Sequence, residues 1–447
     1  MIVIALINKQ ILTAVVAAGD GEIFELEGYG AAGMSGEETI VLTQTDSVDM
    51  PFGSELMMLP NRSPVVYNLF RDEFEVLTHN PYDPKEPIFP VAVFNSPGYV
   101  NRHFCAHEGP KDAPPLPLFS YGAVGFGKKD FRSAALLVDD EPRQDLRLMP
   151  RKGIVKGVDK MRAAYPSNRL MRHLETCALE YGCPAGKNFF LKRYEAPLPT
   201  STVCNARCMG CISLQRENNL CACQDRIAFT PTPEEIAQVS LEHISQVKKA
   251  VVSFGQGCEG EPLTAFDAIE PGIRLIREKT HEGTINLNTN GSLPDKVTAL
   301  CEAGLDAMRV SMNSVREATY TAYFRPRSYV FKDVLASIDA ARRAEKFVAI
   351  NYLNCPGVTD TEAELKALIQ FIDAHDINMI QWRNLNYDPI HYCRIMEEIS
   401  PGGRPLGMAH VINTLKKRFP NLIHGYFNPP KEHHGKRNQG GKKGSHH

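Results

Sequence analysis

Residues 197–390 alternate regularly between strand-like and helix-like segments, and this rhythm constrains the fold more than any other feature of the chain. Short apolar runs occur at 250–255, 284–289, 307–312, 347–353 and 378–383. The intervening segments repeat apolar residues with a helical period. A further run before Cys204 makes six strand–helix units, and strict alternation predicts a parallel sheet with right-handed crossovers. We therefore expect an α/β fold with a partial (β/α)6 barrel, whose functional groups gather at the carboxyl ends of the strands.

The remainder of the chain differs in pattern from this core. We expect five regions: a β-rich N-terminal domain (1–130), a connecting region (131–196), the core (197–390), a C-terminal helical extension (391–430) and a disordered basic tail (431–447). The β-rich domain is predicted to begin with two short strands around Asn8 and Lys9. In the connecting region the pattern predicts one helix, from Asn168 to Tyr181.

Composition narrows the class of protein. A hydrophobic share of 43% and a charged share of 23% are typical of a soluble globular chain. No apolar run approaches the roughly 20 residues that span a bilayer, and the apolar N-terminus lacks the basic start of a signal peptide, so we expect a cytoplasmic location. The net charge of −2 gives no electrostatic argument for nucleic acid or a membrane as a partner.

Cysteines are clustered rather than spread. Five of the twelve lie between positions 204 and 223, in a chain too long and too cysteine-poor for a secreted disulfide scaffold. Cys204, Cys208 and Cys211 are separated by three and two residues and follow a predicted strand directly. Thiolates are soft ligands that suit iron–sulfur clusters and zinc. Three ligands leave one metal position for a group outside the protein.

This cysteine motif and its place before a strand–helix array resemble the radical S-adenosylmethionine (SAM) superfamily. The resemblance implies a [4Fe–4S] cluster on Cys204, Cys208 and Cys211, with SAM chelating the unique iron. One position departs from the family pattern. Gly210 stands where many members carry an aromatic residue beside the adenine, so the adenine contact is left open.

A second segment, after the next predicted strand, fits the same resemblance. Gly260, Glu261 and Pro262 resemble the family's GGEP segment, with Glu259 in place of the first glycine. Glycine lets backbone approach a ligand closely, and the Glu261 carboxylate can accept from an ammonium group. Taken alone, the segment is more typical of a glycine-rich turn with an acid at a helix start, and its place one strand after the cysteine motif favours the cofactor role.

Polar residues also end the later strands. By the resemblance, Asn290 belongs to a TNG segment, and Ser311 and Asn313 stand where the family contacts the SAM ribose or carboxylate; ordinary strand-end caps are the alternative. Gln381, Arg383 and Asn386 are further site candidates, because buried polar groups near a strand end need partners. We expect Trp382, the only tryptophan, to be a core residue.

The other cysteines allow a second metal group. Cys177, Cys183, Cys221 and Cys223 could supply four thiolates to an auxiliary iron–sulfur cluster, although their spacing matches no motif of that kind. Buried free cysteines more commonly serve as small hydrophobic residues.

The resemblance implies an enzyme that reductively cleaves SAM to a 5′-deoxyadenosyl radical and modifies a substrate that the sequence does not identify. A peptide or protein docked on the β-rich domain is one candidate substrate, and a one-electron reductant such as flavodoxin or ferredoxin is the expected partner. Two alternatives remain. One is a zinc-binding interaction module closed by Cys221 or Cys223, and the other is a simple electron-transfer protein.

Overall fold

The computed structural model describes residues 11–110, 112–215 and 220–434. The predicted strand before Asn8 and most of the predicted basic tail lie outside these ranges. Disorder from position 431 is wrong for the first tail residues. They form the short 3-10 turn η5 (Lys431–His433), where the Lys431 amide donates to Thr284 Oγ1 at 2.7 Å.

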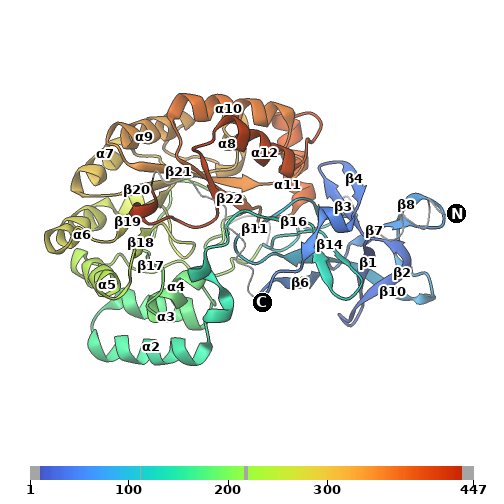
Figure 1. The fold of residues 1–447 in the computed structure, drawn as a ribbon, viewed down its shortest axis with the longest axis horizontal. Helices are drawn as coiled ribbons and strands as arrows, with labels where there is room; N and C mark the ends of the chain where they lie inside the picture. Colours follow the sequence, from blue (N-terminus) through green and yellow to red (C-terminus); the bar gives the residue numbers. More distant parts are fainter. Residues whose placement is uncertain (1–10, 111, 216–219, 435–447) are drawn as a thin grey trace, which may run out of the picture.

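A seven-stranded parallel sheet forms the centre of the molecule (Figure 1). Its strands follow one another in sequence order: β17 (Glu195–Leu198), β18 (Val251–Phe254), β19 (Thr284–Thr289), β20 (Ala307–Met312), β21 (Phe347–Asn354), β22 (Met379–Asn384) and β23 (Ile423–Gly425). The six predicted strands are confirmed as a curved α/β sheet. The seventh, β23, was not predicted, because three residues show no usable periodicity.

Helices cover the outer face of this sheet (Figure 1). They are α5 (Pro233–Gln246), α6 (Phe266–Lys279), α7 (Pro294–Ala303), α8 (Glu317–Phe324), α9 (Phe331–Arg343), α10 (Glu362–His375), α11 (Pro389–Ile399) and α12 (Met408–Arg418). The start of α5 has a clear sequence signal, because Thr232 and Glu235 form a capping box around Pro233. None of the helices in the described ranges is long and apolar enough to cross a membrane.

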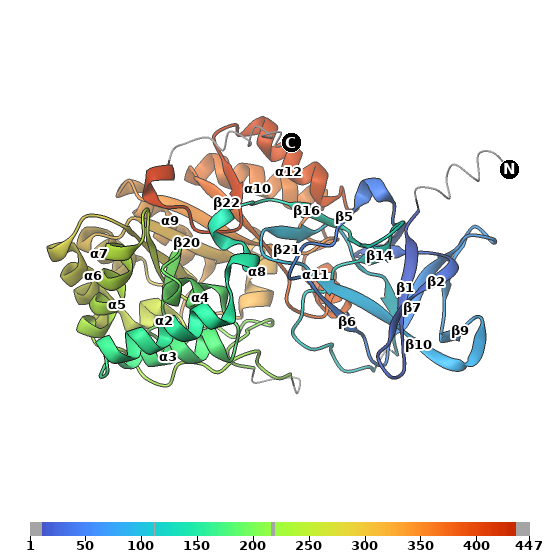
Figure 2. The same ribbon diagram turned by 60° about the horizontal axis from the view of Figure 1, so that its bottom comes forward.

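In the described residues, sixteen strands precede the barrel. They are β1 (Thr13–Ala18), β2 (Ile23–Gly30), β3 (Ala32–Ser35), β4 (Glu38–Val41), β5 (Val48–Asp49), β6 (Glu55–Met58), β7 (Ser63–Asn68), β8 (Glu73–Val76), β9 (His79–Asn80), β10 (Asp83–Phe94), β11 (Tyr99–Asn101), β12 (Phe104–Cys105), β13 (His107–Glu108), β14 (Val124–Phe126), β15 (Phe131–Ser133) and β16 (Ala135–Leu137). All of their pairings are antiparallel. Figures 1 and 2 show these strands gathered on one side of the barrel.

Hydrogen bonds fasten this β-rich part to the carboxyl ends of β21 and β22. The Asn101 amide donates to Asn384 Oδ1 at 2.8 Å, and Asn354 Nδ2 donates to the Asn101 carbonyl at 2.9 Å. A buried ion pair between Arg62 and Asp388, at 3.5 Å, links the same two parts. The strands therefore cover the edge of the sheet at which functional groups were expected.

Three helices come between the two parts in the sequence, where one was predicted: α2 (Arg151–Ala164), α3 (Arg169–Leu179) and α4 (Pro184–Phe190). The predicted helix is confirmed as α3. Helix α2 was not predicted, because glycines such as Gly157 have a low helix propensity. A Cβ at Gly157 would stand 2.2 Å from the Phe190 carbonyl oxygen, so the glycine is what lets α2 pack against α4.

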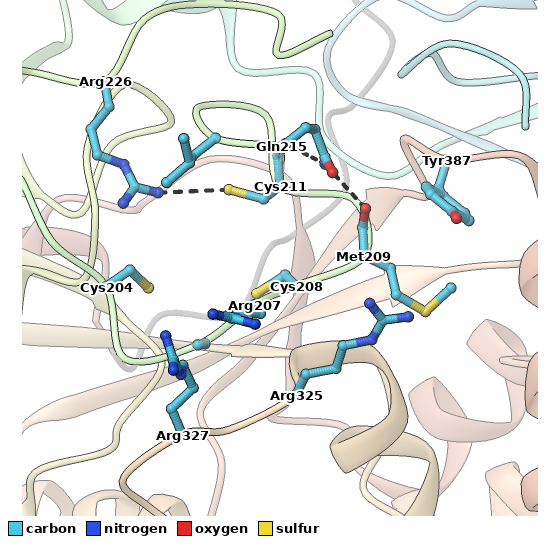
Figure 3. A pocket seen from close by; sticks show the side chains of 12 residues that line it. Cys204, Arg207, Cys208, Met209, Cys211, Gln215, Arg226, Arg325, Arg327 and Tyr387 are labelled. Carbon is cyan, nitrogen blue, oxygen red and sulfur yellow. Dashed lines mark hydrogen bonds between the residues drawn. The ribbon is translucent and has the colours of Figure 1, made fainter. Parts of the chain in front are cut away.

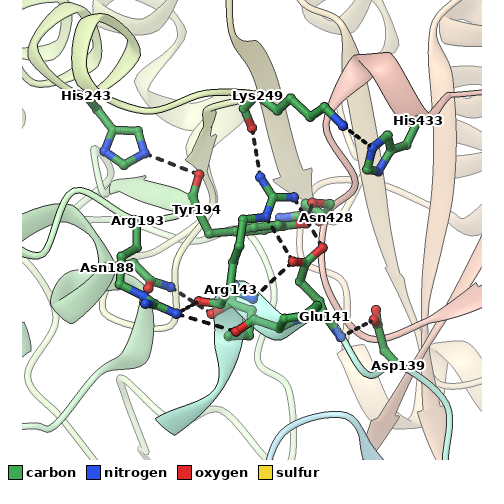
Figure 4. A network of polar contacts seen from close by, with 12 residues as sticks. Asp139, Glu141, Arg143, Asn188, Arg193, Tyr194, His243, Lys249, Asn428 and His433 are labelled. Carbon is green, nitrogen blue, oxygen red and sulfur yellow. Dashed lines mark hydrogen bonds and ion pairs between the residues drawn. The ribbon is translucent and has the colours of Figure 1, made fainter. Parts of the chain in front are cut away.

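A polar network ties the segment before α2 to the amino-terminal side of the sheet (Figure 4). Arg143 donates to the Glu141 carboxylate at 2.9 Å and stacks on the Tyr194 ring at 4.1 Å. Arg193 donates to the Arg143 carbonyl at 2.7 Å. This brace lies at the end of the barrel remote from the cysteine motif.

Candidate cluster and cofactor site

A cavity of about 480 Å³ opens at the carboxyl ends of the parallel strands. All nine residues that the sequence singled out for metal or cofactor lie on its wall: Cys204, Cys208, Cys211, Gly260, Glu261, Pro262, Asn290, Ser311 and Asn313. Ser311 lies near the end of β20, and the other eight come from the loops after β17, β18, β19 and β20, which the parallel topology brings to one edge. Their binding roles stay predictions.

The three cysteine sulfurs surround a common space (Figure 3). A single tetrahedral zinc ion, with Zn–S bonds of about 2.3 Å, would hold its sulfurs about 3.8 Å apart. In the described residues Cys204, Cys208 and Cys211 do not form a set with all sulfurs within 4.8 Å, whether or not Cys221 or Cys223 is included. The motif is therefore wider than a mononuclear zinc site, and its soft donors fit a larger iron–sulfur group.

Burial raises the pKa of two of these thiols. It raises the pKa of Cys204 to about 11, with the Glu261 charge adding to the effect, and the pKa of Cys208 also lies well above its usual range. A thiolate at either position consequently needs a nearby positive charge, which a bound metal group supplies. Arg226 contributes one cation, with Nη2 at 3.8 Å from Cys211 Sγ.

A residue of helix α8 occupies the space beside Gly210. A Cβ at Gly210 would meet the Tyr323 hydroxyl at 3.0 Å and the Asn386 carbonyl at 3.3 Å. Tyr323, in α8, lines the cavity, and its backbone carbonyl accepts from the Met209 amide at 3.0 Å. An aromatic ring is thus present beside the motif, but it is supplied through the tertiary structure.

Gly260 acts by permitting backbone contact. Its amide donates to the Ser201 carbonyl at 2.7 Å, and the next amide, of Glu261, donates to the Val203 carbonyl at 2.9 Å. A Cβ at Gly260 would stand 1.8 Å from the Val203 oxygen. The close approach expected of this glycine is therefore an approach to the strand-like segment that leads into Cys204.

Glu259, which replaces the family's first glycine, is a buried brace. Its carboxylate accepts five hydrogen bonds, from the amides of Thr200, Ser201, Gly255 and Gln256 and from the Thr200 hydroxyl, all between 2.7 and 3.0 Å. These donors belong to the loops after β17 and β18. The carboxylate thereby fixes the two loops that carry the cysteine motif and Gly260. Sequence reasoning noted the substitution but missed this role.

The Glu261 carboxylate is also occupied by the protein. It accepts from the Thr289 hydroxyl, from the Asn290 amide at 2.8 Å and from the Leu263 amide at 3.1 Å. Burial raises its pKa to about 7. The Glu261 carboxylate therefore joins the ends of β18 and β19, and its contact with an ammonium group stays a prediction. Asn290 continues the chain of contacts, since its Nδ2 donates to Asn205 Oδ1 at 2.8 Å.

Asn313, just after β20, and Asn351, on β21, line the cavity and carry side-chain oxygens without a partner in the described part of the protein. Asn313 Nδ2 donates to the Thr319 carbonyl and the Tyr392 hydroxyl, both at 3.0 Å. Within the described ranges, neither Asn313 Oδ1 nor Asn351 Oδ1 has a hydrogen-bond partner, although both are buried. Buried acceptors normally pair, so these two atoms fit a ligand that carries donors, such as the amino and ribose hydroxyl groups of SAM.

Two arginines extend into the same cavity, Arg309 beside Ser311 on β20 and Arg383 on β22. Arg309 donates to Gln381 Oε1 at 2.7 Å, and desolvation lowers its pKa to about 9. Gln381 is buried below Arg309 and does not line the cavity, whereas Arg383 and Asn386 do. Trp382 is a core residue, as predicted, with its indole nitrogen donating to His424 at 3.1 Å.

The four cysteines considered for an auxiliary cluster point to different neighbours. Cys177 contacts Cys258 at 3.7 Å between sulfurs, while Cys223 Sγ lies 3.8 Å from the Leu118 carbonyl oxygen in the N-terminal part. Cys221 and Cys223 are exposed. An auxiliary cluster on these four residues remains an untested prediction.

Comparisons with known proteins agree with this geometry. Residues 198–372 match the model of the radical SAM superfamily. The chain is 27% identical over 190 residues to a GTP 3′,8-cyclase of Limosilactobacillus fermentum, covering 42% of this chain and 52% of that protein. It is 31% identical over 170 residues to a GTP 3′,8-cyclase of Corynebacterium glutamicum (36% and 41%), and 26% identical over 211 residues to a probable dual-specificity RNA methyltransferase RlmN 1 of Opitutus terrae (43% and 57%).

Two solved structures are similar at low identity. One is native anSMEcpe with bound AdoMet, at 16% identity and a TM-score of 0.33, covering 43% of this chain and 52% of that one. The other is SuiB of Streptococcus suis, at 12% identity and a TM-score of 0.37, covering 71% and 72%. The chain spans about half of the first curated relative that it matches and less of the next. A [4Fe–4S] cluster and SAM are the cofactors of the matched superfamily. On the cysteine motif, the barrel and the family match together, residues 198–372 belong to the radical SAM superfamily.

Proposed function

We propose that this chain is a radical SAM enzyme in which Cys204, Cys208 and Cys211 hold a [4Fe–4S] cluster beside bound SAM. The observation that carries the proposal is the convergence of the cysteine motif, Gly260 and the unsatisfied Asn313 acceptor on one cavity. When bound, the cluster supplies one electron to SAM, which splits into methionine and a 5′-deoxyadenosyl radical that takes hydrogen from the substrate.

The protein's own residues hold and shield the reactants. Glu259 and Gly260 fix the loop that presents Cys204, while Tyr323 offers a ring beside the motif. Asn313 and Asn351 offer acceptors to the donors of SAM. The strands packed on the ends of β21 and β22 cover the site, which keeps water from a reactive radical.

The cavity favours a substrate with an anionic group. Arg309 and Arg383 line its wall, and the lining acids, Glu259 and Glu261, are already hydrogen bonded to protein donors. The curated relatives named above include GTP 3′,8-cyclases, which agrees with a phosphorylated small molecule. A peptide bound on the β-rich part is the alternative substrate. The two are distinguished by incubating the enzyme with a deuterated protein fraction or a deuterated small-molecule fraction. Deuterium would enter 5′-deoxyadenosine only from the protein fraction if the substrate were a peptide.

The expected electron donor is an acidic one-electron carrier such as flavodoxin or ferredoxin. Four arginines line a second, smaller pocket next to the cysteine motif: Arg207, Arg226, Arg325 and Arg327 (Figure 3). A charge reversal at the exposed Arg207 or Arg327 should slow reduction by flavodoxin and leave reduction by dithionite unchanged. We also propose a cytoplasmic location, because all twelve cysteines are free thiols.

Anaerobic reconstitution tests the proposed activity. We expect about four irons per chain and, with dithionite and SAM, release of 5′-deoxyadenosine. Cys208→Ser should abolish both results, whereas Cys301→Ser, in the core of α7, should keep both. Stoichiometric zinc on the cysteine motif with no SAM cleavage would refute the proposal.

A further inference from the structure

Three side chains outside the cavity form a compact set of metal-binding donors. His173 and Cys177 lie four residues apart on one face of α3, and Cys258 lies in the loop after β18. Cys177 Sγ is 3.7 Å from Cys258 Sγ and 3.5 Å from His173 Nε2, and all three donor atoms lie within 4.8 Å of one another. Both sulfurs are buried and the imidazole is partly exposed, which leaves an ion a route in.

These separations match the edges of a small metal tetrahedron. With bonds of about 2.3 Å to sulfur and 2.0–2.1 Å to nitrogen, a tetrahedral zinc ion holds two sulfurs about 3.8 Å apart and a sulfur and a nitrogen about 3.5 Å apart. We infer that His173, Cys177 and Cys258 bind a mononuclear zinc-class divalent ion, separate from the cysteine motif in the barrel. Both contacts of Cys177 Sγ, with Cys258 Sγ and with His173 Nε2, already have the lengths that such an ion requires.

Two other interpretations fit less well. A disulfide needs its sulfurs at about 2.05 Å, so Cys177 and Cys258 would have to approach and lose the contact with His173. Two buried thiols acting only as small hydrophobic groups would not need the imidazole. A zinc ion would bind both cysteines as thiolates, and their protons would be released to solvent.

The proposed ion would fasten a helix outside the barrel to the cofactor loop. Cys258 directly precedes Glu259, the carboxylate that joins the loops after β17 and β18. The Cys258 carbonyl accepts from the Ile227 amide at 2.8 Å, which holds the same loop on its other side. The proposed ion would set the position of the segment that precedes Gly260, with its fourth coordination position left to a water molecule, and zinc itself has no redox chemistry.

The test uses the full-length chain with Cys204, Cys208 and Cys211 all changed to Ser, so that zinc cannot occupy the cluster site. We expect about one zinc per chain in this background, and added cobalt(II) should give the visible bands of a tetrahedral thiolate complex. His173→Gln or Cys177→Ser in the same background should weaken zinc binding at least about tenfold. Cys301→Ser, also a buried cysteine, is the matched control and should keep the zinc.

Folding is checked separately. A chelator should lower the Tm of the background protein and leave the Tm of its His173→Gln derivative unchanged. In the wild-type holoenzyme, His173→Gln should lose zinc and keep its iron, which separates this proposal from the proposed SAM chemistry. The proposal is overturned if the background protein holds no zinc, if Cys177→Ser holds as much as Cys301→Ser, if Cys177 and Cys258 are found as a disulfide, or if the background protein assembles an iron–sulfur group.

Discussion

Replacing Gly260 with alanine should separate the loop of the cysteine motif from the loop after β18. The new methyl carbon would stand 1.8 Å from the Val203 carbonyl oxygen and 2.4 Å from its carbon, and both are backbone atoms that cannot rotate away. Atoms of this kind come no closer than roughly 3 Å, so the two segments must part by about 1 Å. The hydrogen bonds from Gly260 to Ser201, at 2.7 Å, and from Glu261 to Val203, at 2.9 Å, would then be lost or badly stretched.

The magnitude follows from these contacts. Two lost backbone hydrogen bonds cost about 1–3 kcal/mol together, and forced overpacking costs about 1–3 kcal/mol. We expect the free energy of unfolding to fall by about 2–5 kcal/mol. Because Val203 directly precedes Cys204, iron content and SAM cleavage should fall in proportion.

The assay compares Gly260→Ala with Gly19→Ala. At Gly19 an added Cβ meets only Pro87, at an ordinary 3.8 Å, and the position lies in the N-terminal part. Urea unfolding of the apo-proteins gives the stability difference, and iron analysis after anaerobic reconstitution gives the functional one. Equal urea midpoints and equal iron content in the two variants would refute the assigned role of Gly260.

Three further predictions test neighbouring contacts. Burial raises the pKa of Glu261 from about 4.5 when unfolded to about 7, so its contribution to stability is present below pH 4.5. That contribution, about 3 kcal/mol in all, is lost as the pH rises through 7. Glu261→Gln should flatten this part of the pH–stability profile of the apo-protein, and an unchanged slope would contradict the burial argument. Tyr323→Leu should weaken SAM binding about tenfold, the equivalent of one aromatic contact of about 1.4 kcal/mol, whereas Tyr323→Phe should not; equal dissociation constants from equilibrium dialysis would remove the ring from the cofactor site. Asp388→Asn should destabilise the junction between the β-rich part and the barrel by about 3–5 kcal/mol, because it leaves Arg62 buried without its counter-ion. Hydrogen exchange of the β11 amides should become faster, and unchanged protection of these amides would contradict the prediction.

The barrel could be predicted from the sequence because its signals are local. The runs at 284–289 and 307–312 coincide with β19 and β20, in which apolar residues alternate with other residues over a short stretch between helical segments. The cysteine motif and the Gly260 segment could likewise be identified by spacing alone. Helix α2 could not be predicted, because its Gly157 is required by the close packing against Phe190, which is a tertiary contact.

Other features depend on residues that are distant in sequence. Tyr323 stands beside Gly210 although more than a hundred positions separate them, and no local pattern assigns that ring to the cysteine motif. Cys258 meets His173 and Cys177 across a gap of about eighty residues, so no spacing in the sequence indicates that these three side chains form a group. Glu259 looked like a lost glycine until its five donors were located.

The sequence by itself determined the chemistry at the centre of this protein: three soft donors on one loop, placed before an alternating α/β array that has to form a parallel sheet. Spacing and periodicity are local properties, so they can be measured on the sequence without knowledge of the fold. Only the tertiary structure decided which groups surround that centre. Contacts between residues distant in sequence produce no periodic pattern, so they could be located only in the folded chain. These contacts account for the burial of Glu259 and Glu261, the unpartnered oxygens of Asn313 and Asn351, and the donor set around Cys258.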